Sequence, residues 1–337
     1  MKTKLKNPTS QNVATLAGVS QSAVSRCFTK GASISSRTKL RVIEAAKKLG
    51  YKHQAIQHSF SSSVDGGLVG VILPYVTNRY YPEVLTELHE ALRMSGYRIL
   101  LITTDDGEEL DDNLILPYLK EKLIAIISAT KPTESFVTSC TERRIQVIAY
   151  NRNWNIPTTS SVACDHRMGG EMIAQLFIAK GHRHIGLIKG PTGSYVSQQR
   201  CKGFLDQLKK NAKVKTTIAD GFFTYEGGQK AAEKLLRNNK LTAIFCADDT
   251  MAFGCIDFIK EKTKLKIPHQ IEVIGYDDIS VASWDSYNLT TIRQPIRQMA
   301  KLTTQLIGDY LKDSEFEPVN HLIQGRLISR KTTQYKY

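Results

Sequence analysis

The residues best suited to chemistry lie in one short segment, residues 21–28. Its polar side chains are of the types that hydrogen-bond to base edges in DNA, and they are Gln21, Ser22, Ser25 and Arg26. On a helix, Val24 and Phe28 would share one apolar face, because they are four residues apart, and the polar side chains would face outward. A helix is thin enough to enter the major groove. The segment is therefore a candidate recognition helix.

A preceding helix would be needed to hold this segment against DNA. Val13, Ala14 and Ala17 have apolar spacing, and Gly18 suits a tight turn between helices. Ser20 then lies where the N-cap of the next helix belongs. The pattern predicts a helix-turn-helix, although an ordinary pair of antiparallel helices would show the same spacing.

The distribution of charge favours the DNA-binding interpretation. Residues 1–63 contain eleven Lys or Arg residues and one acid, Glu44, and so carry +10 of the net charge of +14. The remaining 274 residues hold 35 basic and 31 acidic residues, a net charge of +4. A basic N-terminal part on a nearly balanced body is typical of a nucleic-acid binder. A solvated charged face is the alternative.

A third helix should complete the N-terminal headpiece. Ser35 and Ser36 offer caps, and Gly50 offers an end. We expect the inward stripe to consist of Leu40, Ile43, Ala46 and Leu49. Residues 51–60 then allow a short helix with Ile56 and Phe60 four apart, and residues 61–67 form a flexible linker.

From residue 68 onward, apolar strands alternate with helices in two series. The first has strands at 68–73, 99–103, 124–128 and 147–150, with helices at 82–95, 108–121 and 132–143. The second has strands at 161–164, 185–189, 243–247 and 272–276, with helices at 168–180, 197–210, 225–238 and 251–261. Uninterrupted apolar strands between helices predict two doubly wound parallel sheets. Ligands bind beyond the carboxyl ends of such strands, so a cleft between two such subdomains would surround one small molecule.

Composition excludes several other classes. No apolar run approaches the roughly 20 residues that span a bilayer, and the basic N-terminus lacks the apolar region of a signal peptide, so we expect a cytoplasmic protein with no membrane partner. The six cysteines show no CxxC or His-rich spacing, which predicts buried thiols and no metal. Because neither GxGxxG nor GxxxxGK[ST] spacing occurs, we expect no nucleotide or other cofactor.

The whole chain resembles the lactose-repressor/galactose-repressor (LacI/GalR) family of bacterial transcription factors. The likeness rests on VATLAGVSQSAVSRCF in the headpiece and, in order along the body, on GVILPYVTNRYYPEVL, GHRHIGLIKGP, AIFCADDTMAFG, VIGYDDI, LTTIRQP and ISRKTT. It implies a periplasmic-binding-protein-like core that senses a small molecule, and a homodimer that binds a pseudo-palindromic operator. Pairing of dimers into tetramers is left open.

The resemblance also implies domain limits. They are a headpiece at 1–50, a hinge helix and linker at 51–67, and a core at 68–337. Within the core, one subdomain covers about 68–160 and 293–322, and the other covers about 161–290 and 325–337.

In the headpiece, the resemblance implies base contacts for Gln21, Ser22 and Arg26. Arg26 could instead hold a phosphate. Asn12, Ser20, Ser25 and Lys30 would contact the DNA backbone or cap helices. Phe60 stands at the position of the hinge's minor-groove wedge, and a Phe can unstack base steps. The hinge departs from the family pattern at 53, 54, 57 and 58, where His, Gln, Gln and His replace Pro, Asn, Ala and Arg.

In the core, five residues fall on the family's effector-binding positions: Asn151, Arg200, Phe223, Asp248 and Asp277. Asp165, Tyr80 and Tyr81 are weaker candidates. Charged donors and acceptors with an aromatic face would suit a polyhydroxylated ligand such as a sugar or a derivative. Structural roles remain open, because Asp248 and Asp277 could cap helices and Arg200 could form an interdomain ion pair.

The sequence therefore predicts a ligand-responsive DNA-binding regulator, with repression as its expected action, and not an enzyme. A carbohydrate-active enzyme is one rival, because Asp248 and Asp277 would share the cleft; a turnover assay separates it. A secreted sugar receptor is another, and cell fractionation separates it.

Overall fold

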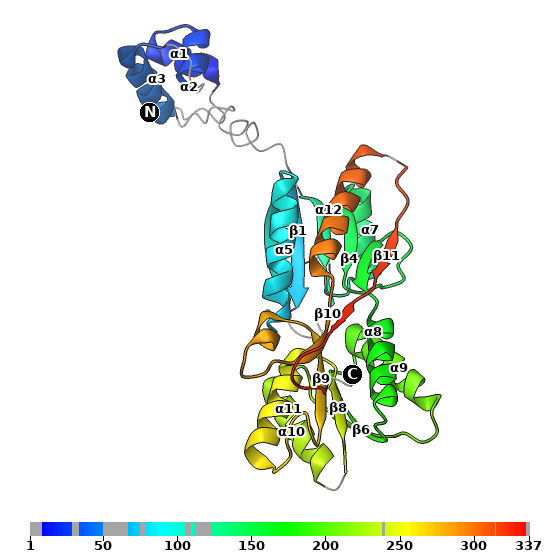
Figure 1. Ribbon diagram of the computed structural model, residues 1–337. Helices are drawn as coiled ribbons and strands as arrows, with labels where there is room; N and C mark the ends of the chain where they lie inside the picture. The colour runs from blue at the N-terminus through cyan, green and yellow to red at the C-terminus, as the bar shows by residue number, and fades with distance from the viewer. Residues whose placement is uncertain are drawn as a thin grey trace. The chain divides into compact units, whose positions relative to one another are not determined.

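The computed structural model describes residues 9–28, 34–49, 67–74, 78–104, 109–111, 113, 123–237, 240–313 and 315–334. The chain divides into two compact units, Met1–Gly66 and Gly67–Tyr337 (Figure 1). The first is helical, and the second contains two α/β lobes. This architecture confirms the predicted fold class.

Within its described residues, the headpiece contains three helices, α1 (Ser10–Ala17), α2 (Gln21–Phe28) and α3 (Ser36–Leu49). Gly18 ends α1 with a left-handed backbone, φ 60°, and a Cβ there would lie 2.8 Å from a guanidinium nitrogen of Arg41. That nitrogen donates to the Ala17 carbonyl at 2.6 Å, which ties α3 to the turn. The predicted turn at Gly18 is therefore confirmed, and only a residue without a side chain fits it easily.

The expected inward stripe of α3 is partly wrong. Leu40 is 63% exposed and Ile43 is 43% exposed, whereas Val42 is fully buried and Ala45 and Ala46 are nearly so. The inward face is thus rotated from the predicted one, because small side chains let α3 approach α1 and α2 closely. Ser35 accepts from the backbone N–H of Thr38, so its predicted capping role is present.

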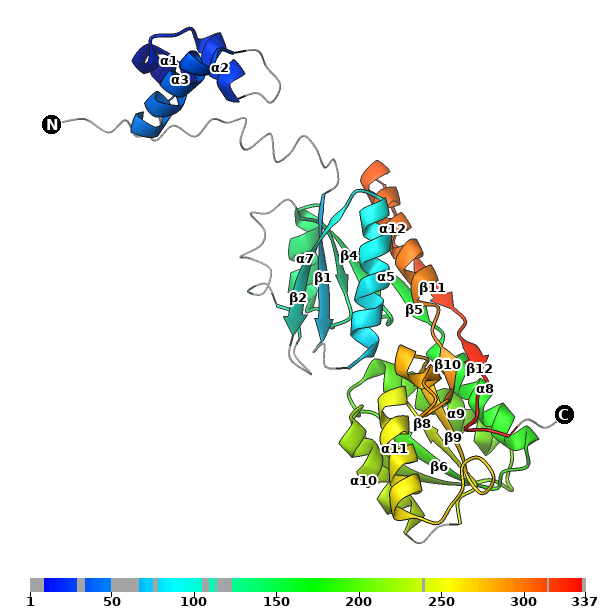
Figure 2. The same ribbon diagram turned by 60° about the vertical axis from the view of Figure 1, so that its left-hand side comes forward.

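The N-terminal lobe is built on a sheet in the order β11-β5-β4-β3-β1-β2, with every neighbouring pair parallel. The strands are β1 (Leu68–Pro74), β2 (Arg98–Thr104), β3 (Leu123–Ser128), β4 (Gln146–Tyr150), β5 (Ser160–Cys164) and β11 (Asn320–Ile323). Its helices are α5 (Tyr80–Met94), α7 (Glu134–Glu142) and α12 (Ile296–Lys312). Figure 2 shows α5 and α12 side by side along this lobe.

The C-terminal lobe has the order β12-β10-β9-β8-β6-β7, in which only the β12–β10 pair is antiparallel among the described strands. Its strands are β6 (His184–Lys189), β7 (Lys215–Asp220), β8 (Ala243–Cys246), β9 (Glu272–Asp277), β10 (Thr290–Arg293) and β12 (Arg326–Ile328). Its helices are α8 (His166–Ala179), α9 (Tyr195–Lys209), α10 (Tyr225–Leu236) and α11 (Asp249–Lys262), with a 3-10 turn, η2 (Ser280–Ser283).

Two sequence expectations require correction here. The strand at 161–164 was expected to open the second series, but it is β5, paired with β4 and β11 in the N-terminal lobe. Its apolar pattern fits either sheet, and the chain crosses to the other lobe only after it. The strand β7 was not expected, because its alternating sequence KTTIAD belongs to a half-exposed edge. The helix expected at 108–121 lies mostly outside the described residues.

Candidate functional site

The carboxyl ends of the strands bring six polar side chains together where the two lobes meet. The N-terminal lobe supplies Tyr80 at the start of α5 and Asn151 just after β4. The C-terminal lobe supplies His166 at the start of α8, Arg200 on α9 and Asp277 at the end of β9. Gln294 lies on the segment that crosses from β10 to α12. We call these six residues the junction ring.

One half of the junction ring runs from Arg200 to Tyr80. The Arg200 Nε donates to His166 Nδ1 at 3.3 Å, and His166 Nε2 lies 2.9 Å from Asn151 Oδ1. The Asn151 Nδ2 then donates to the hydroxyl of Tyr80 at 2.8 Å. Because Nδ1 accepts from a guanidinium, His166 is neutral and carries its proton on Nε2.

The other half closes the ring through Asp277. The hydroxyl of Tyr80 donates to Gln294 Oε1 at 3.0 Å, and Gln294 Nε2 donates to Asp277 Oδ1 at 2.7 Å. Arg200 Nη2 lies 2.8 Å from the same carboxylate oxygen. Each donor in the ring thus has one acceptor, and the ring links the two lobes without a break.

Arg200 is the structural centre of the ring. It is 2% exposed, its Nη1 donates to the Ala247 carbonyl at 2.6 Å, and its guanidinium carbon lies 3.9 Å from the ring centre of Tyr276. Burial and the charge of Arg200 lower the pKa of His166 well below its usual value. Burial raises the pKa of Asp277 despite the opposing effect of Arg200.

Close packing of α8 on α9 holds His166 against Arg200. A Cβ added at Gly203 on α9 would lie 1.9 Å from the carbonyl oxygen of Arg167 on α8. No side chain can occupy that space unless one helix moves, so this glycine fixes the separation of the helices that carry the two residues.

The backbone is strained at three of the candidate effector residues. Asn151 has φ 60°, Phe223 has φ 57° and Asp277 has φ 122°, all values that non-glycine residues rarely adopt. Such conformations persist where surrounding structure enforces them, and they concentrate at functional sites. Two of the three, Asn151 and Asp277, are members of the junction ring.

Asp248 lies beside the ring at the end of β8. It is 1% exposed and caps α11, with the backbone N–H of Met251 donating at 2.8 Å. Asn78, from the N-terminal lobe, approaches its other oxygen at 3.4 Å. Burial and the nearby charge of Asp277 raise the pKa of Asp248 to about 7. Asp248 thus caps α11 and also contacts the N-terminal lobe.

The remaining candidates lie around the ring. Asp165 caps α8, with the N–H of Met168 donating at 2.9 Å. Phe223 is half-buried and lies over Gly190, at the end of β6. Tyr81 packs edge-to-face against Tyr80, with ring centres 5.6 Å apart. The structure therefore places these three near the strand ends but outside the hydrogen-bonded ring.

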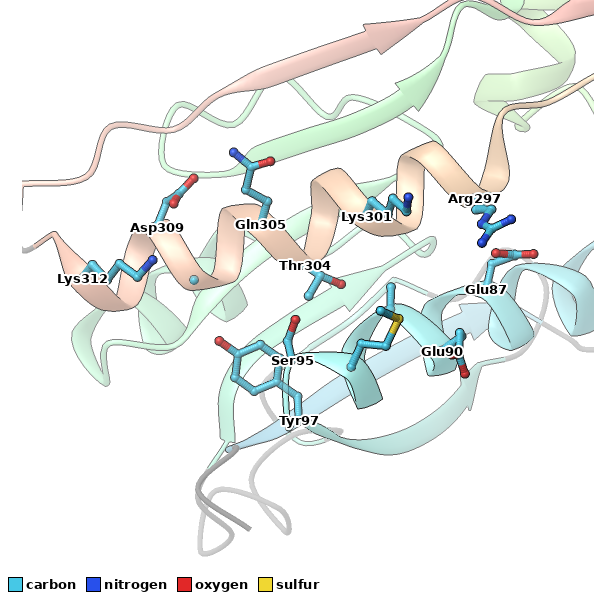
Figure 3. A pocket seen from close by; sticks show the side chains of 13 residues that line it. Glu87, Glu90, Ser95, Tyr97, Arg297, Lys301, Thr304, Gln305, Asp309 and Lys312 are labelled. Atoms are coloured by element: carbon cyan, nitrogen blue, oxygen red, sulfur yellow. The ribbon is translucent and has the colours of Figure 1, made fainter.

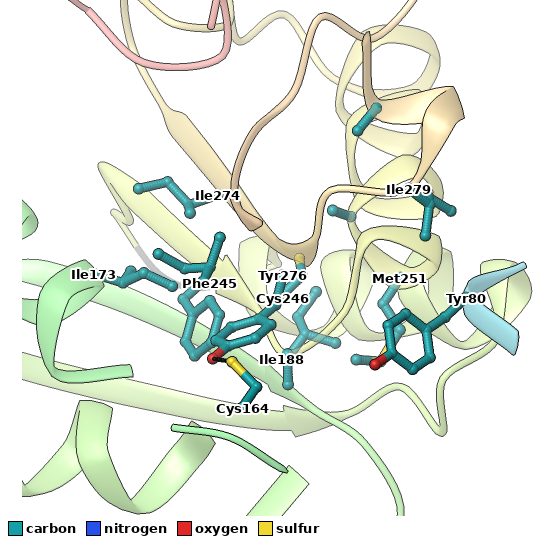
Figure 4. Close-up of a cluster of buried hydrophobic side chains, with 14 of the residues drawn as sticks. Tyr80, Cys164, Ile173, Ile188, Phe245, Cys246, Met251, Ile274, Tyr276 and Ile279 are labelled. Atoms are coloured by element: carbon teal, nitrogen blue, oxygen red, sulfur yellow. Dashed lines mark hydrogen bonds between the residues drawn. The ribbon is translucent and has the colours of Figure 1, made fainter. Parts of the chain in front are cut away.

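Other contacts also cross between the lobes. The backbone N–H of Ser280 donates to Glu83 on α5 at 2.7 Å. The Sγ of Cys164, at the end of β5, lies 3.9 Å from the hydroxyl oxygen of Tyr276 on β9. Figure 4 shows this pair, and it shows Tyr80 beside Met251. All six cysteines are buried. The junction is thus held by polar and apolar contacts together.

In the headpiece, the polar side chains of α2 are exposed as predicted. Gln21 donates to Ser10 at 2.8 Å, and Ser20 lies 2.9 Å from Ser22 and accepts from the N–H of Ala23. Ser25 is exposed, and Arg26 Nε lies 3.4 Å from the carbonyl of Ser22. Asn12 forms a capping box with Thr9. Lys30 and Phe60 lie outside the described residues.

Comparison with known proteins identifies the family. Residues 9–54 match the family described as bacterial regulatory proteins, lacI family, and residues 67–333 match the one described as periplasmic binding proteins and sugar binding domain of LacI family. The chain belongs to the LacI family. It is therefore a DNA-binding regulator with a ligand-binding core, which confirms the function expected from the sequence.

Individual LacI-family proteins align over nearly the full chain. The transcriptional repressor PurR of Aliivibrio fischeri is 25% identical over 332 residues, covering 96% of this chain and 98% of that protein. The lac repressor dimer bound to operator and the anti-inducer ONPF shares the fold, with a TM-score of 0.73, 21% identity and coverage of 98% and 100%. A CelR–cellobiose complex has a TM-score of 0.68, 24% identity and coverage of 97% and 100%.

Sequence reasoning on this LacI-family chain missed two ring members, His166 and Gln294. Neither stands in a spacing that marks chemistry, since His166 opens a helix and Gln294 lies in the LTTIRQP segment. The available signal was Asp165, a weaker candidate that directly precedes His166. Asn78 was missed for the same reason.

A separate pocket of about 440 Å³ lies between α5 and α12, away from the ring. Figure 3 shows charged side chains of both signs around it, including Glu87, Glu90, Arg297, Lys301 and Lys312. Within the described residues, no group of three or more His, Cys, Asp or Glu side chains could hold a metal. The same residues include no helix both long and apolar enough to cross a bilayer.

Proposed function

We propose that this LacI-family chain is a cytoplasmic repressor that binds a pseudo-palindromic operator as a homodimer. A small polar effector would raise or lower its affinity for that operator. The headpiece would read the operator through Gln21, Ser22 and Arg26, with Phe60 as a minor-groove wedge. The core would bind its effector where the lobes meet and would not convert it. PurR is named a repressor, and the lac repressor is described as a dimer on operator.

The junction ring is the observation that carries the proposal. Its members are the groups that a polyhydroxylated ligand would use. At present Asn151 and Arg200 both hydrogen-bond to His166, and Arg200 pairs with Asp277. An effector must exchange these internal hydrogen bonds for its own, so its binding changes the contacts that join the lobes. A ligand with different affinities for two lobe arrangements shifts the balance between them.

Coupling to DNA follows by linkage. If one lobe arrangement suits operator binding, an effector that favours either arrangement changes operator affinity, and the operator changes effector affinity by the same factor. Sugars or sugar derivatives are the proposed class. The support is that hydroxyl groups suit the donors and acceptors present, that Phe223 could stack on a ring, and that CelR is described with cellobiose.

An operator-binding titration tests this function. Duplexes selected from random DNA would supply the operator, and a library of sugars and nucleosides would supply effectors. At least one compound should change operator affinity by fivefold or more, the usual lower range of allosteric coupling. Tyr80→Phe removes the hydroxyl that links Asn151 to Gln294, so it should reduce that change to less than about twofold.

Tyr97→Phe provides the matched control, because Tyr97 is a half-buried tyrosine outside the ring. It should respond as the wild type does. Failure to select any preferred duplex would contradict the DNA-binding proposal. A wild-type response in Tyr80→Phe would show that the ring does not couple effector to operator.

A further inference from the structure

The junction contains more buried acid than base. Asp248, Asp249 and Asp277 are each no more than 8% exposed. Burial, and then the charge of Asp277, raises the pKa of both Asp248 and Asp249. Among the described residues, Asp277 forms an ion pair with Arg200, whereas Asp248 and Asp249 form none. Three carboxylates thus share one guanidinium in a water-poor setting, where like charges repel strongly.

Arg200 and Arg152 lie near the junction, and Arg200 is already matched. Arg200 is committed to Asp277, His166 and the Ala247 carbonyl. Arg152, which follows Asn151, is half-buried, and its Nε has no hydrogen-bond partner among the described residues.

Asp249 and Asp248 differ in how well their oxygens are satisfied. Asp249 accepts from Thr291 at 2.6 Å and from the N–H of Ile279 at 3.0 Å, so both oxygens have good partners. Asp248 accepts from the N–H of Met251 at one oxygen. Among the residues that the structure describes, which leave out 75–77, its second oxygen has only Asn78 of the N-terminal lobe, at 3.4 Å. A stronger donor at this oxygen would relieve an unfavourable buried charge.

We propose that the effector is a neutral or cationic molecule that places a hydrogen-bond donor, best an amino group, against Asp248, and that phosphorylated or carboxylated molecules are rejected. The inference rests on the proposed function, in that the effector binds at this junction. A hydroxyl donates one hydrogen bond to the carboxylate, and an ammonium group also neutralises its charge. A phosphate or carboxylate would bring further negative charge to the three buried carboxylates.

Calorimetric titration of the full chain with matched probes tests the selectivity. One series is glucosamine, glucose, glucuronate and glucose 6-phosphate, and the other is adenosine and AMP. Within each series, each anionic member should bind at least about tenfold more weakly than the neutral member. Asp248→Asn keeps the shape and the capping ability of the side chain and should narrow that gap to about threefold.

Tighter binding of an anionic probe than of its neutral counterpart would overturn the proposal, and so would a panel in which no probe binds. Operator binding is measured separately. A chain that binds its operator but prefers anions retains the proposed function and loses this inference. If the chain shows the charge preference but binds no DNA, the effector selectivity stands and the proposed function is contradicted.

Unfolding by urea tests the charge at Asp248 without any ligand. A carboxylate with a raised native pKa costs stability as pH rises from its unfolded pKa, near 4, through about 7. Asp248→Asn should therefore match the wild type near pH 4, gain on it as pH rises and exceed it fully at pH 8.5. Asp285→Asn, at an exposed aspartate, should show no such change. No stability gain in Asp248→Asn at pH 8.5 would show that the charge is already compensated.

Discussion

At the scale of single residues, the headpiece and the core depend on different kinds of side chain. Arg26 is exposed on α2, where a guanidinium can make two hydrogen bonds to a guanine edge. Arg26→Ala should cost about 1–3 kcal/mol of binding free energy on the selected operator and much less on random DNA. Competition binding on both duplexes measures this difference. An equal loss on both would place Arg26 on the phosphate backbone.

We expect His166 to make the unfolding free energy of the core depend on pH, and a variant can separate its contribution. Its native pKa lies well below its unfolded value of about 6.5, because burial and Arg200 disfavour the imidazolium. The native state therefore binds fewer protons, and stability is fully present above pH 6.5. It should fall by about 1.4 kcal/mol per pH unit as pH drops below that value toward the native pKa.

His166→Gln offers the comparison, since an amide keeps one donor and one acceptor but does not titrate. The difference in unfolding free energy between wild type and variant, measured from pH 7.5 to 5, should change in favour of the variant as pH falls. A constant difference would mean that the native and unfolded pKa values of His166 are equal.

At the scale of elements, the packing of α8 on α9 sets the geometry of the ring. Gly203→Ala would place a Cβ 1.9 Å from the Arg167 carbonyl oxygen, so α8 and α9 would have to separate. We expect a loss of about 2 kcal/mol or more of unfolding free energy, as for overpacked cores. Gly308→Ala on α12 is the control, because no atom lies within 4 Å of its added Cβ. That control should gain about 0.5–1 kcal/mol from helix propensity.

The elements also show what the sequence could and could not predict. Buried strands such as 68–73 and 185–189 were predictable because both faces are covered and the apolar run is continuous. The edge strand β7 was not, because half of its residues face solvent. Nor could the pattern assign 161–164 to its sheet, since which lobe a strand joins depends on where the chain crosses.

The members of the junction ring were predictable only in part. Asn151, Arg200 and Asp277 follow from the family motifs, and the structure joins them in one ring. His166 and Gln294 join it only through the folded arrangement, because Gln294 reaches the ring from a crossing segment far along the chain. A resemblance of motifs thus finds strand-end residues but not the side chains that the neighbouring elements bring to them.

At the scale of the whole molecule, the uneven distribution of charge should make DNA binding and effector binding respond differently to salt. The first 63 residues carry +10 and the remaining 274 carry +4, so phosphate neutralisation belongs mainly to the headpiece. Counterions released from DNA make log affinity fall linearly with log salt, and roughly 6–10 phosphate contacts cost about 10³–10⁵ in affinity between 50 and 200 mM salt. Operator and random-DNA binding should both weaken within this range.

Effector binding should respond differently to the same change in salt. The ring is buried, and screening acts weakly on buried charges, so effector affinity should change by less than about threefold over that interval. The factor by which the effector shifts operator affinity should also be preserved, because it is a difference between lobe arrangements with the same headpiece charge. Parallel titrations at 50, 100 and 200 mM salt measure all three quantities. If the coupling factor fell in step with operator affinity, the effector would be acting on the headpiece–phosphate contacts themselves and not through the junction of the lobes.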